Sequence, residues 1–334
     1  MSKKLGTVAL FLGAFLLALA ALSKFYMYDE LAVVPLNNES TSVAETAAGK
    51  DAEYLDVAAG LKPTTGPLKN TKVVVGNVEE GKKASEELDR DIAVWDIYDC
   101  TDKPSFDCGS GETALSATDD RVAFDRTSGE AVDWEGARSD VDGEIIEPGK
   151  FEGLYFKFPF DAKKKTYPFW DGTLREATPA KFVGEGKVKG MKTYTYEQTI
   201  EPIKTGTIDV PGSLVGSDET TVTADRIYSS VSTYEVEPVT GVVLVGQTAQ
   251  DSYLELDGER VLTTTKATLR YTEDNIASTV DEYKSKALLL SAVKTYVPLG
   301  GGALGLALIV LGLFTRRGSR EGARASHKGE LVSH

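Results

Sequence analysis

The sequence predicts a mainly β protein with an antiparallel β domain, built as a sandwich or an open barrel in one lobe or two, between N- and C-terminal transmembrane helices. Three observations predict this fold: an uncharged apolar run near each end, short alternating segments separated by turn residues in the middle, and few helix signals there. Many short strands with regularly spaced turns are typical of antiparallel β architectures.

The N-terminal apolar run, Leu5–Leu22, carries no charge and follows Lys3 and Lys4. Two interpretations compete. A cleaved signal peptide would use Ala18–Ala20 as its small-residue cleavage site, whereas a retained anchor needs a longer apolar span. Because the run is longer than the ~7–15 apolar residues of a signal peptide, we favour a transmembrane anchor over residues 1–24.

The C-terminal apolar run predicts a second transmembrane helix over residues 297–315. Val297–Phe314 contains no charged residue, and Arg316 and Arg317 follow it directly. Basic residues favour the cytoplasmic side of a membrane. We therefore expect a cytoplasmic tail at 316–334, both termini inside the cell, and a central extracytoplasmic domain tethered to the inner cell membrane.

Small residues in these runs suggest that the two helices pair. Gly301 and Gly305 form a G-x-x-x-G pattern, and Gly13 lies in a similar small-residue pattern of the first run. Such faces let helices approach closely. The alternative is that glycine is simply frequent in membrane helices.

Charge and histidine content exclude several classes of function. The chain has a net charge of −14 although both ends are basic, so the middle is strongly acidic, which argues against nucleic acid and against anionic lipid surfaces as charge partners. Both histidines, His327 and His334, lie in the C-terminal tail. This excludes histidine-dependent triads and histidine-based zinc sites from the middle, and we expect no metal and no cofactor.

The two cysteines predict a disulfide. Cys100 and Cys108 enclose a seven-residue loop that contains Pro104. Outside the cytoplasm, where thiols oxidise, such a pair closes readily.

The central β domain is expected over residues 25–271, with an amphipathic stalk helix over 272–296 that lies on the sheet and leads into the second span. Residues 37–50 are small and polar and predict a linker. Strands or hairpins are expected at 71–78, 92–97, 122–134, 154–160, 193–200, 229–250 and 252–271, and Asp257-Gly258 is a strong hairpin turn.

Aromatic residues concentrate in one stretch of this domain. We expect them either to pack in the core, as aromatics usually do, or to line an apolar cleft that binds a ligand. The residues are Phe156, Phe158, Phe160, Tyr167, Phe169 and Trp170.

Several segments taken together resemble the actinobacterial PorA-like family of porin-like membrane proteins. They are "DRTSGEAVDW", "YPFWDG", "PAKFVGEGKVKGMKTYTY", "VEPVTGVVLV", "LRYTEDNI" and "VPLGGGALGLALIVLGL", in this order along nearly the whole chain. The resemblance implies two membrane helices around an exported β domain, no catalytic residues, and a part in assembly of a lipid-rich envelope that includes lipoglycans.

These observations lead to one main functional hypothesis and three alternatives. The main hypothesis is a non-enzymatic, membrane-anchored extracytoplasmic protein that binds or regulates lipid or lipoglycan components of the cell envelope. The first alternative is a porin-like or lipid-carrier protein. The second is a carboxylate-dependent enzyme acting on envelope glycans, which needs two facing acids about 5–10 Å apart. The third is a structural partner of other envelope membrane proteins.

Overall fold

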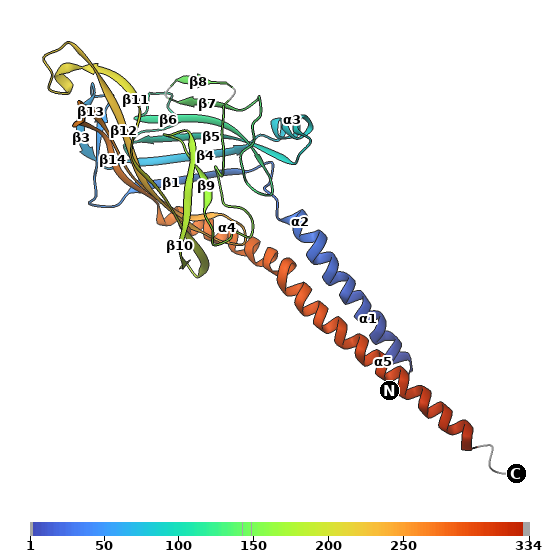
Figure 1. Ribbon diagram of the computed structural model, residues 1–334. Coiled ribbons are helices and arrows are strands. Elements are labelled where there is room, and N and C mark those ends of the chain that lie inside the picture. The colour runs from blue at the N-terminus through green and yellow to red at the C-terminus, as the bar shows by residue number, and fades with distance from the viewer. Residues whose placement is uncertain (1–2, 142, 148, 330–334) are drawn as a thin grey trace. The chain divides into compact units, whose positions relative to one another are not determined.

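The computed structural model describes residues 3–141, 143–147 and 149–329, and these form two compact units. One unit takes the residues up to Val33 and those from Ser285 onward, and is helical. The other, the β body, takes Val34–Lys284. Figure 1 labels the elements of both units.

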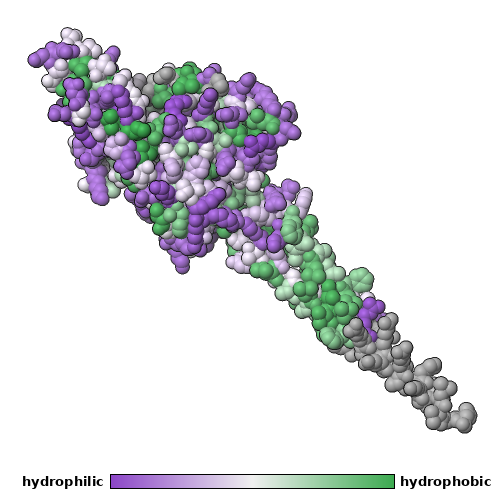
Figure 2. Space-filling model, in the orientation of Figure 1, coloured by the Kyte–Doolittle hydropathy of each residue, from purple (hydrophilic) through white to green (hydrophobic). Residues whose placement is uncertain are grey.

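Two apolar helical stretches, Lys4–Leu31 and Glu273–Arg316, are each long and apolar enough to cross a membrane, and the second begins within the β body, which ends at Lys284. Both contain a short π-helical turn. The helical segments of the whole chain are α1 (Lys3–Leu22), η1 (Ser23–Met27), α2 (Tyr28–Leu31), α3 (Val78–Leu88), the 3₁₀ turn η2 (Gly212–Leu214), α4 (Glu273–Ser291), η3 (Ala292–Tyr296) and α5 (Val297–Gly329). Within the helical unit, exposed apolar side chains form a continuous green area on the visible face of the two apolar stretches (Figure 2).

The β body is built on one fourteen-stranded sheet, and its paired strands in the described part of the chain run antiparallel. The strands are β1 (Glu39–Thr46), β2 (Ala52–Asp56), β3 (Lys62–Gly66), β4 (Lys69–Gly76), β5 (Ile92–Asp102), β6 (Ser116–Asp125), β7 (Arg138–Val141), β8 (Glu144–Ile146), β9 (Tyr167–Asp171), β10 (Glu176–Val188), β11 (Met191–Pro211), β12 (Thr221–Val236), β13 (Val243–Leu256) and β14 (Glu259–Tyr271). Their order is β8-β7-β6-β5-β4-β1-β14-β13-β12-β11-β10-β9, with the β2–β3 hairpin attached to β14. The sequence-based prediction of a mainly antiparallel β fold between two apolar helices is confirmed, and the sheet is open.

Single bridges bring the two halves of this open sheet together. Phe124 of β6 pairs with Ala131, Glu130 pairs with Leu154, and Leu154 pairs with Phe169 of β9. The Leu154 amide donates to the Pro168 carbonyl at 2.9 Å, and the Trp170 amide donates to the Leu154 carbonyl at 2.8 Å. The sheet therefore curls around the segment that precedes β9. We call the face that bears Trp95 and Tyr196 the inner face.

Hairpins with recognisable turn chemistry form as predicted. Asp257 and Gly258, with φ of 52° and 83°, join β13 to β14. A two-residue turn with positive φ at both positions matches the twist of the flanking strands. The turn around Pro238–Gly241 joins β12 to β13, and β4, β5 and β11 also lie where strands were expected.

Two local predictions were wrong, and one helix was not predicted. Residues 37–50 are not a linker, because β1 lies inside them and pairs with both β4 and β14, so tertiary pairing stabilises a strand of small polar residues. The stretch 154–160 forms no strand, since Leu154 makes single bridges and Phe158 turns into the core. Helix α3 was missed because its buried face consists of Gly81 and Ala84, which give no apolar period.

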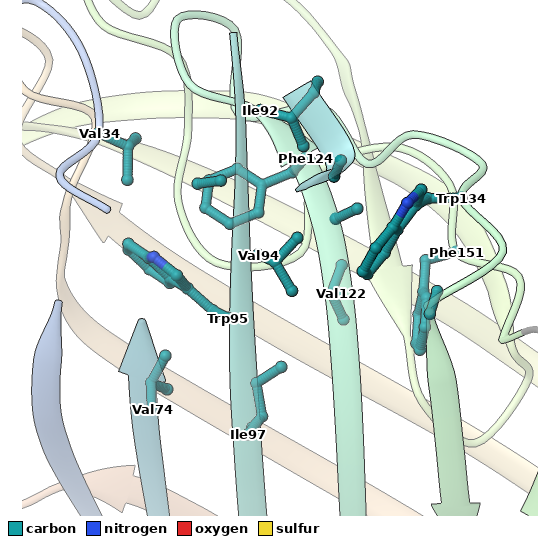
Figure 3. Packing of buried hydrophobic residues seen from close by; sticks show 14 of the residues in the cluster. Val34, Val74, Ile92, Val94, Trp95, Ile97, Val122, Phe124, Trp134 and Phe151 are labelled. Carbon is teal, nitrogen blue, oxygen red and sulfur yellow. The ribbon is translucent and has the colours of Figure 1, made fainter. Parts of the chain in front are cut away.

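The inner face is apolar at one end of the curl, where two clusters of buried side chains form the core. The first cluster packs β4, β5 and β6 against the end of β9, and its large members include Trp95, Phe124 and Trp134 (Figure 3). Trp170 of β9 also belongs to it. The second packs β10, β11 and β12 against the other side of β9, around Phe158. Strand β9 is thus covered on both faces.

Candidate functional site

The six aromatic residues proposed as a cleft lie in these two core clusters. Tyr167, Phe169 and Trp170 are buried, as is Phe158, while Phe156 and Phe160 are half-buried and pack against the first cluster. Phe158 stacks on Tyr196 with ring centroids 4.3 Å apart. The described structure therefore shows these rings packed against one another, and a ligand would have to separate them to reach their faces.

Where the apolar clusters end, the inner face becomes polar. On β12, Ser230 and Ser232 point inward and are 4% exposed, and on the next strand Thr248 and Gln250 lie opposite them. Side chains directly opposite in an antiparallel pair share a face. The row continues to Ala267 on β14, which lies opposite Gln250. Two strands of the curl therefore present hydroxyl and amide groups inward.

Tyrosine hydroxyls join this row to β9. The Tyr228 hydroxyl donates to an Asp171 carboxylate oxygen at 2.9 Å, although β12 and β9 are not neighbours in the sheet. The Tyr234 hydroxyl donates to the Gln198 amide oxygen at 2.9 Å, and the Gln198 amide nitrogen donates to the Phe169 carbonyl at 2.7 Å. Burial raises the pKa of both the Tyr228 and Tyr234 hydroxyls, so both stay protonated donors.

On the opposite wall, β4, β5 and β6 carry an inward-facing ion pair and a buried acid. Lys72 Nζ lies 2.8 Å from Asp99, and their side chains are 36% and 28% exposed. Burial lowers the pKa of Lys72, but the adjacent Asp99 carboxylate outweighs burial and the pKa is raised. This ammonium is therefore charged at neutral pH and already paired.

Asp120 of β6 is 3% exposed and is held by two hydroxyl donors. The Tyr155 hydroxyl donates to one carboxylate oxygen at 2.6 Å, and the Ser139 hydroxyl donates to the other at 2.5 Å. Burial raises the Asp120 pKa, while these two donors and the nearby cations Lys72 and Arg175 work in the opposite direction. Burial, followed by the Asp120 charge, also raises the Tyr155 pKa well above its usual value.

Residues of the two walls lie near one another. Tyr271 and Asp120 lie close enough to Lys72 to affect its pKa, and Asp171 and Tyr271 likewise affect that of Tyr234. We call this region the inner polar surface. It comprises Lys72, Asp99, Asp120, Tyr155, Asp171, Arg175, Tyr228, Ser230, Ser232, Tyr234, Thr248, Gln250 and Tyr271.

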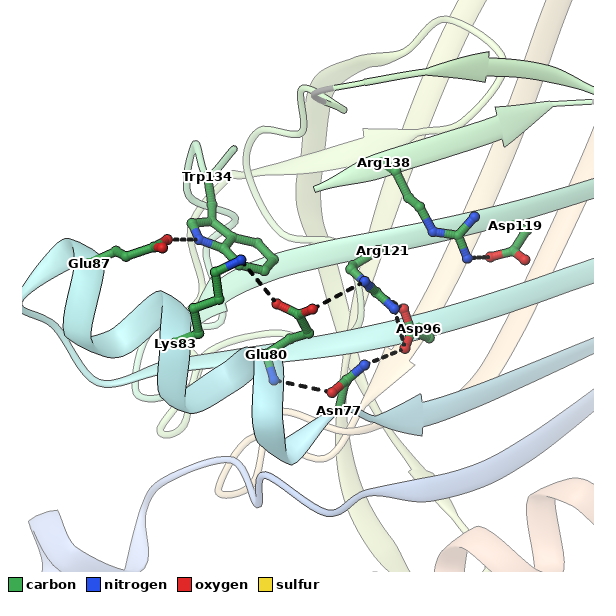
Figure 4. A network of polar contacts seen from close by, with 9 residues as sticks. All are labelled: Asn77, Glu80, Lys83, Glu87, Asp96, Asp119, Arg121, Trp134 and Arg138. Carbon is green, nitrogen blue, oxygen red and sulfur yellow. Dashed lines mark hydrogen bonds and ion pairs between the residues drawn. The ribbon is translucent and has the colours of Figure 1, made fainter. Parts of the chain in front are cut away.

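A second polar region lies on the outside of the body, beside α3 (Figure 4). Arg121 binds Asp96 at 2.6 Å, and Asn77 both donates to Asp96 and caps α3 by accepting from the Glu80 amide. The Trp134 indole donates to Glu87 at 2.7 Å. These contacts fasten α3 to β5 and β6.

Next to α3 lies an open hollow of about 700 Å³. It is lined by Lys83, Glu87, Leu88, Asp133, Trp134, Glu135, Gly136, Gly149 and Lys150. Trp134, its aromatic member, is 5% exposed, so most of the ring is unavailable to a ligand.

The disulfide between Cys100 and Cys108 is present, with the two Cα atoms 6.1 Å apart. It closes the loop between β5 and β6. The Asp102 carboxylate also holds this loop, because it accepts a hydrogen bond from the Leu115 amide at 2.7 Å. This loop lies at the far end of β5 from α3 and holds the start of β6 in place.

In the helical unit, Gly13 and Gly305 lie at the contact between α1 and α5. A methyl group on Gly13 would lie 2.7 Å from the Gly305 carbonyl oxygen, which is closer than side-chain carbons come. Gly301 is less tightly placed, since its nearest neighbour would be the Ala20 methyl at 3.8 Å.

Comparison with known proteins identifies the family. The family model described as Porin PorA matches residues 5–314, which takes in both apolar helices and the whole β body. The chain belongs to the Porin PorA family.

Two relatives bear the same family name. A Porin PorA of Corynebacterium amycolatum is 24% identical, and the alignment covers 95% of this chain and 99% of the relative. A Porin PorA of Corynebacterium resistens is 26% identical over 37% of this chain and 33% of the relative. With family membership and two candidate spans, the chain is a membrane protein, and the family name describes a pore and no reaction.

The family resemblance was predicted from the sequence. The inner polar surface was not, because its members are ordinary strand residues spread from Lys72 to Tyr271. The signal that could have found it is the run of Ser, Thr and Gln at alternate positions of β12 and β13, where a core-facing row should be apolar.

Proposed function

We propose that this chain is a porin-like protein of the cell envelope, which handles small polar solutes on the inner polar surface of its β body. The observation that carries the proposal is the change of the inner face from two aromatic clusters to hydroxyl, amide and charged groups. A fully apolar inner face would indicate that this face only forms the hydrophobic core. The family name of the relatives supports a solute-related function.

The β body itself is not expected to lie in lipid. A membrane-spanning sheet needs an apolar outer band on alternate residues. Here the outward-facing positions of the long strands include ion pairs, such as Lys204 with Asp225 at 2.7 Å and Arg260 with Asp251 at 2.8 Å. The two apolar helices are the segments suited to the bilayer.

Uptake by cells tests the proposed function. Deleting the gene should slow entry of a small radiolabelled polar solute such as glycerol, and the wild-type chain should restore it. Thr248→Trp, which fills the inner polar surface, should fail to restore uptake, whereas Gln247→Trp on the outer face should succeed. Unchanged uptake in the deletion strain would refute the proposal. Planar bilayers would then show whether assembled copies conduct alone or need a partner protein.

We further propose that both termini are cytoplasmic, that the β body is extracytoplasmic, and that the helices lie in the inner membrane. Lys3 and Lys4 before the first span and Arg316 and Arg317 after the second support this orientation. The disulfide supports an oxidising location for the body. Protease added to intact spheroplasts should digest the body but spare a tag placed after His334; the reverse pattern would refute this topology.

A second candidate is the binding or regulation of envelope lipids or lipoglycans, and it is favoured by the density of aromatic side chains between Phe156 and Trp170. It requires that the packed rings part to admit a chain. Lipid extraction and native mass spectrometry of the purified protein should then show a bound lipid, and a lipid-free protein would refute it. The carboxylate-enzyme hypothesis gains no support from the family or from the relatives, whose names describe a porin.

A further inference from the structure

The balance of charge on the inner polar surface limits what can bind there. Lys72 is paired with Asp99, and the positive charge of Arg175 lies close enough to Asp120 to affect its pKa. Asp171 adds a further carboxylate. Phosphate and sulfate groups are recognised by cations that are free to pair with them. The surface therefore offers no positive excess for an anionic headgroup.

The apolar groups nearby are also already engaged. Phe158, Phe169 and Tyr234 contact one another, with ring centroids 5.3 Å apart for Phe158 and Phe169 and 4.6 Å apart for Phe169 and Tyr234. An acyl chain gains its binding free energy from apolar area removed from water. Since these rings bury one another, the polar part of the inner face has little such area to offer.

What the surface does offer is many uncharged donors and acceptors. The hydroxyls of Tyr155, Tyr228 and Tyr234 already donate their protons to Asp120, Asp171 and Gln198, which leaves their oxygens to accept hydrogen bonds. Gln250 and Thr248 are half-buried and lie on the inner face, where the Thr248 hydroxyl shares a hydrogen bond with Ser232. A hydroxyl group both donates and accepts a hydrogen bond. The surface is therefore matched to a ligand that presents many hydroxyls.

Ser230 is the residue that points most directly to an outside partner. It is 4% exposed, and its buried hydroxyl makes no hydrogen bond that meets the distance and angle criteria with a described residue, although it lies close enough to the Tyr228 hydroxyl to lower the pKa of Tyr228. A buried hydroxyl without a partner is costly, and in native proteins it usually has a water or ligand atom beside it.

From these four observations we propose that the inner polar surface binds a neutral, polyhydroxylated ligand of the carbohydrate class. Tyr228, Ser230 and Gln250 would exchange hydrogen bonds with its hydroxyls, and the partly exposed Tyr271 ring would cover a sugar face. This inference rests on the proposed function and specifies its solute class.

The test uses the full-length protein in a detergent without a sugar headgroup. An array of neutral oligosaccharides is screened first, and the strongest binder is then titrated by saturation-transfer NMR. Inositol hexakisphosphate serves as the anionic probe and phosphatidylcholine vesicles as the lipid probe. We expect a neutral oligosaccharide to bind and both other probes to fail.

Matched variants locate the site. Gln250→Leu and Ser230→Ala alter the inner row, and each should weaken oligosaccharide binding by about tenfold, the effect of losing one to two hydrogen bonds to a ligand. Gln247→Leu makes the first change on the outer face of the same strand and should leave binding unaltered. No binding to any neutral oligosaccharide, preference for the anionic or lipid probe, or equal affinity of Gln250→Leu and wild type would overturn the inference.

The uptake experiment separates this inference from the proposed function. Normal uptake of glycerol after deletion together with oligosaccharide binding would remove the porin-like function and leave the binding site. Lost uptake of glycerol without oligosaccharide binding would leave the porin-like function and remove the ligand class.

Discussion

Lys157 is a lysine whose surroundings disfavour its positive charge. Its amine is buried without a hydrogen-bond partner among the described residues and lies 3.6 Å from the centre of the Phe160 ring. Burial lowers the Lys157 pKa to about 7, and the charge of Glu237 opposes this only in part. The ring attracts the cation, but an ammonium group without hydrogen-bond acceptors is poorly solvated.

This environment makes the stability of the protein depend on pH. Between about pH 7 and the ordinary lysine value of 10.5, the unfolded chain holds a proton on Lys157 that the folded chain has released. The free energy of unfolding therefore rises with pH across this window and is lowest below pH 7. Lys157→Met should stabilise the protein by roughly 1–3 kcal/mol at pH 6 and much less at pH 10.

Urea unfolding of the full-length protein, followed by tryptophan fluorescence from pH 6 to pH 10, measures this effect. Lys181→Met removes an exposed lysine of β10 and serves as the control. Parallel pH profiles for wild type and Lys157→Met would show that the buried amine has no such role.

At the scale of elements, the hairpins were easier to predict from the sequence than the other strands and helices. Asp257-Gly258 specifies its own turn, whereas β1 forms because β4 and β14 lie on both sides of it. Helix α3 depends on Ala84 packing on β5 and on the Asn77 cap, neither of which gives an apolar period. Pairing between distant strands is decided by tertiary structure, and local propensity carries little of that information.

The residues of the candidate site could not be predicted from the sequence for a related reason. Aromatic density predicted either a core or a cleft, and the packing of Phe158 on Tyr196 depends on strands that are far apart in the chain. Ser230 and Ser229 look equivalent in the sequence. The curl of the sheet decides that Ser230 faces inward and Ser229 outward.

Substitutions in the turn between β12 and β13 measure how tightly the segment before β9 is held. Gly241 has φ of 76°, and a methyl group there would lie 1.9 Å from the Phe158 carbonyl oxygen. Gly216 has the same φ of 76° but open space around it. Gly216→Ala should therefore cost about 1–2 kcal/mol for backbone strain alone, and Gly241→Ala at least about 4 kcal/mol because the backbone must also move.

Thermal and urea unfolding of the two variants provide the comparison, because the strain common to both cancels in the difference. Similar losses of stability would mean that the Phe158 segment moves aside freely. That result would also indicate that the aromatic clusters can separate to admit a lipid chain.

At the scale of the whole molecule, the two spans are far apart in sequence yet pair closely in the helical unit. The hydroxyl of Ser23 donates to the Val293 carbonyl at 2.7 Å, and Gly6, Gly13, Gly305 and Gly312 all lie where a methyl group would meet the other helix within 3.0 Å. In lipid, such contacts rely on close packing and hydrogen bonds, since burial of apolar surface brings little gain there. We therefore propose that these positions need glycine for the two helices to pair.

Substitution of Gly13 tests this pairing. Gly13→Leu should separate the helices, because the added side chain would overlap the Gly305 carbonyl and Ile309. Gly300→Leu adds the same side chain where nothing lies within 4 Å and should be harmless. The readout is disulfide crosslinking between cysteines introduced at Ala20 and Gly301, whose neighbouring positions make them a suitable pair. We expect a several-fold lower crosslinking yield for Gly13→Leu and an unchanged yield for Gly300→Leu. Equal crosslinking yields in both variants would show that the glycine contact does not hold the two helices together. Each helix would then be held by its own contact with lipid and not by the other helix.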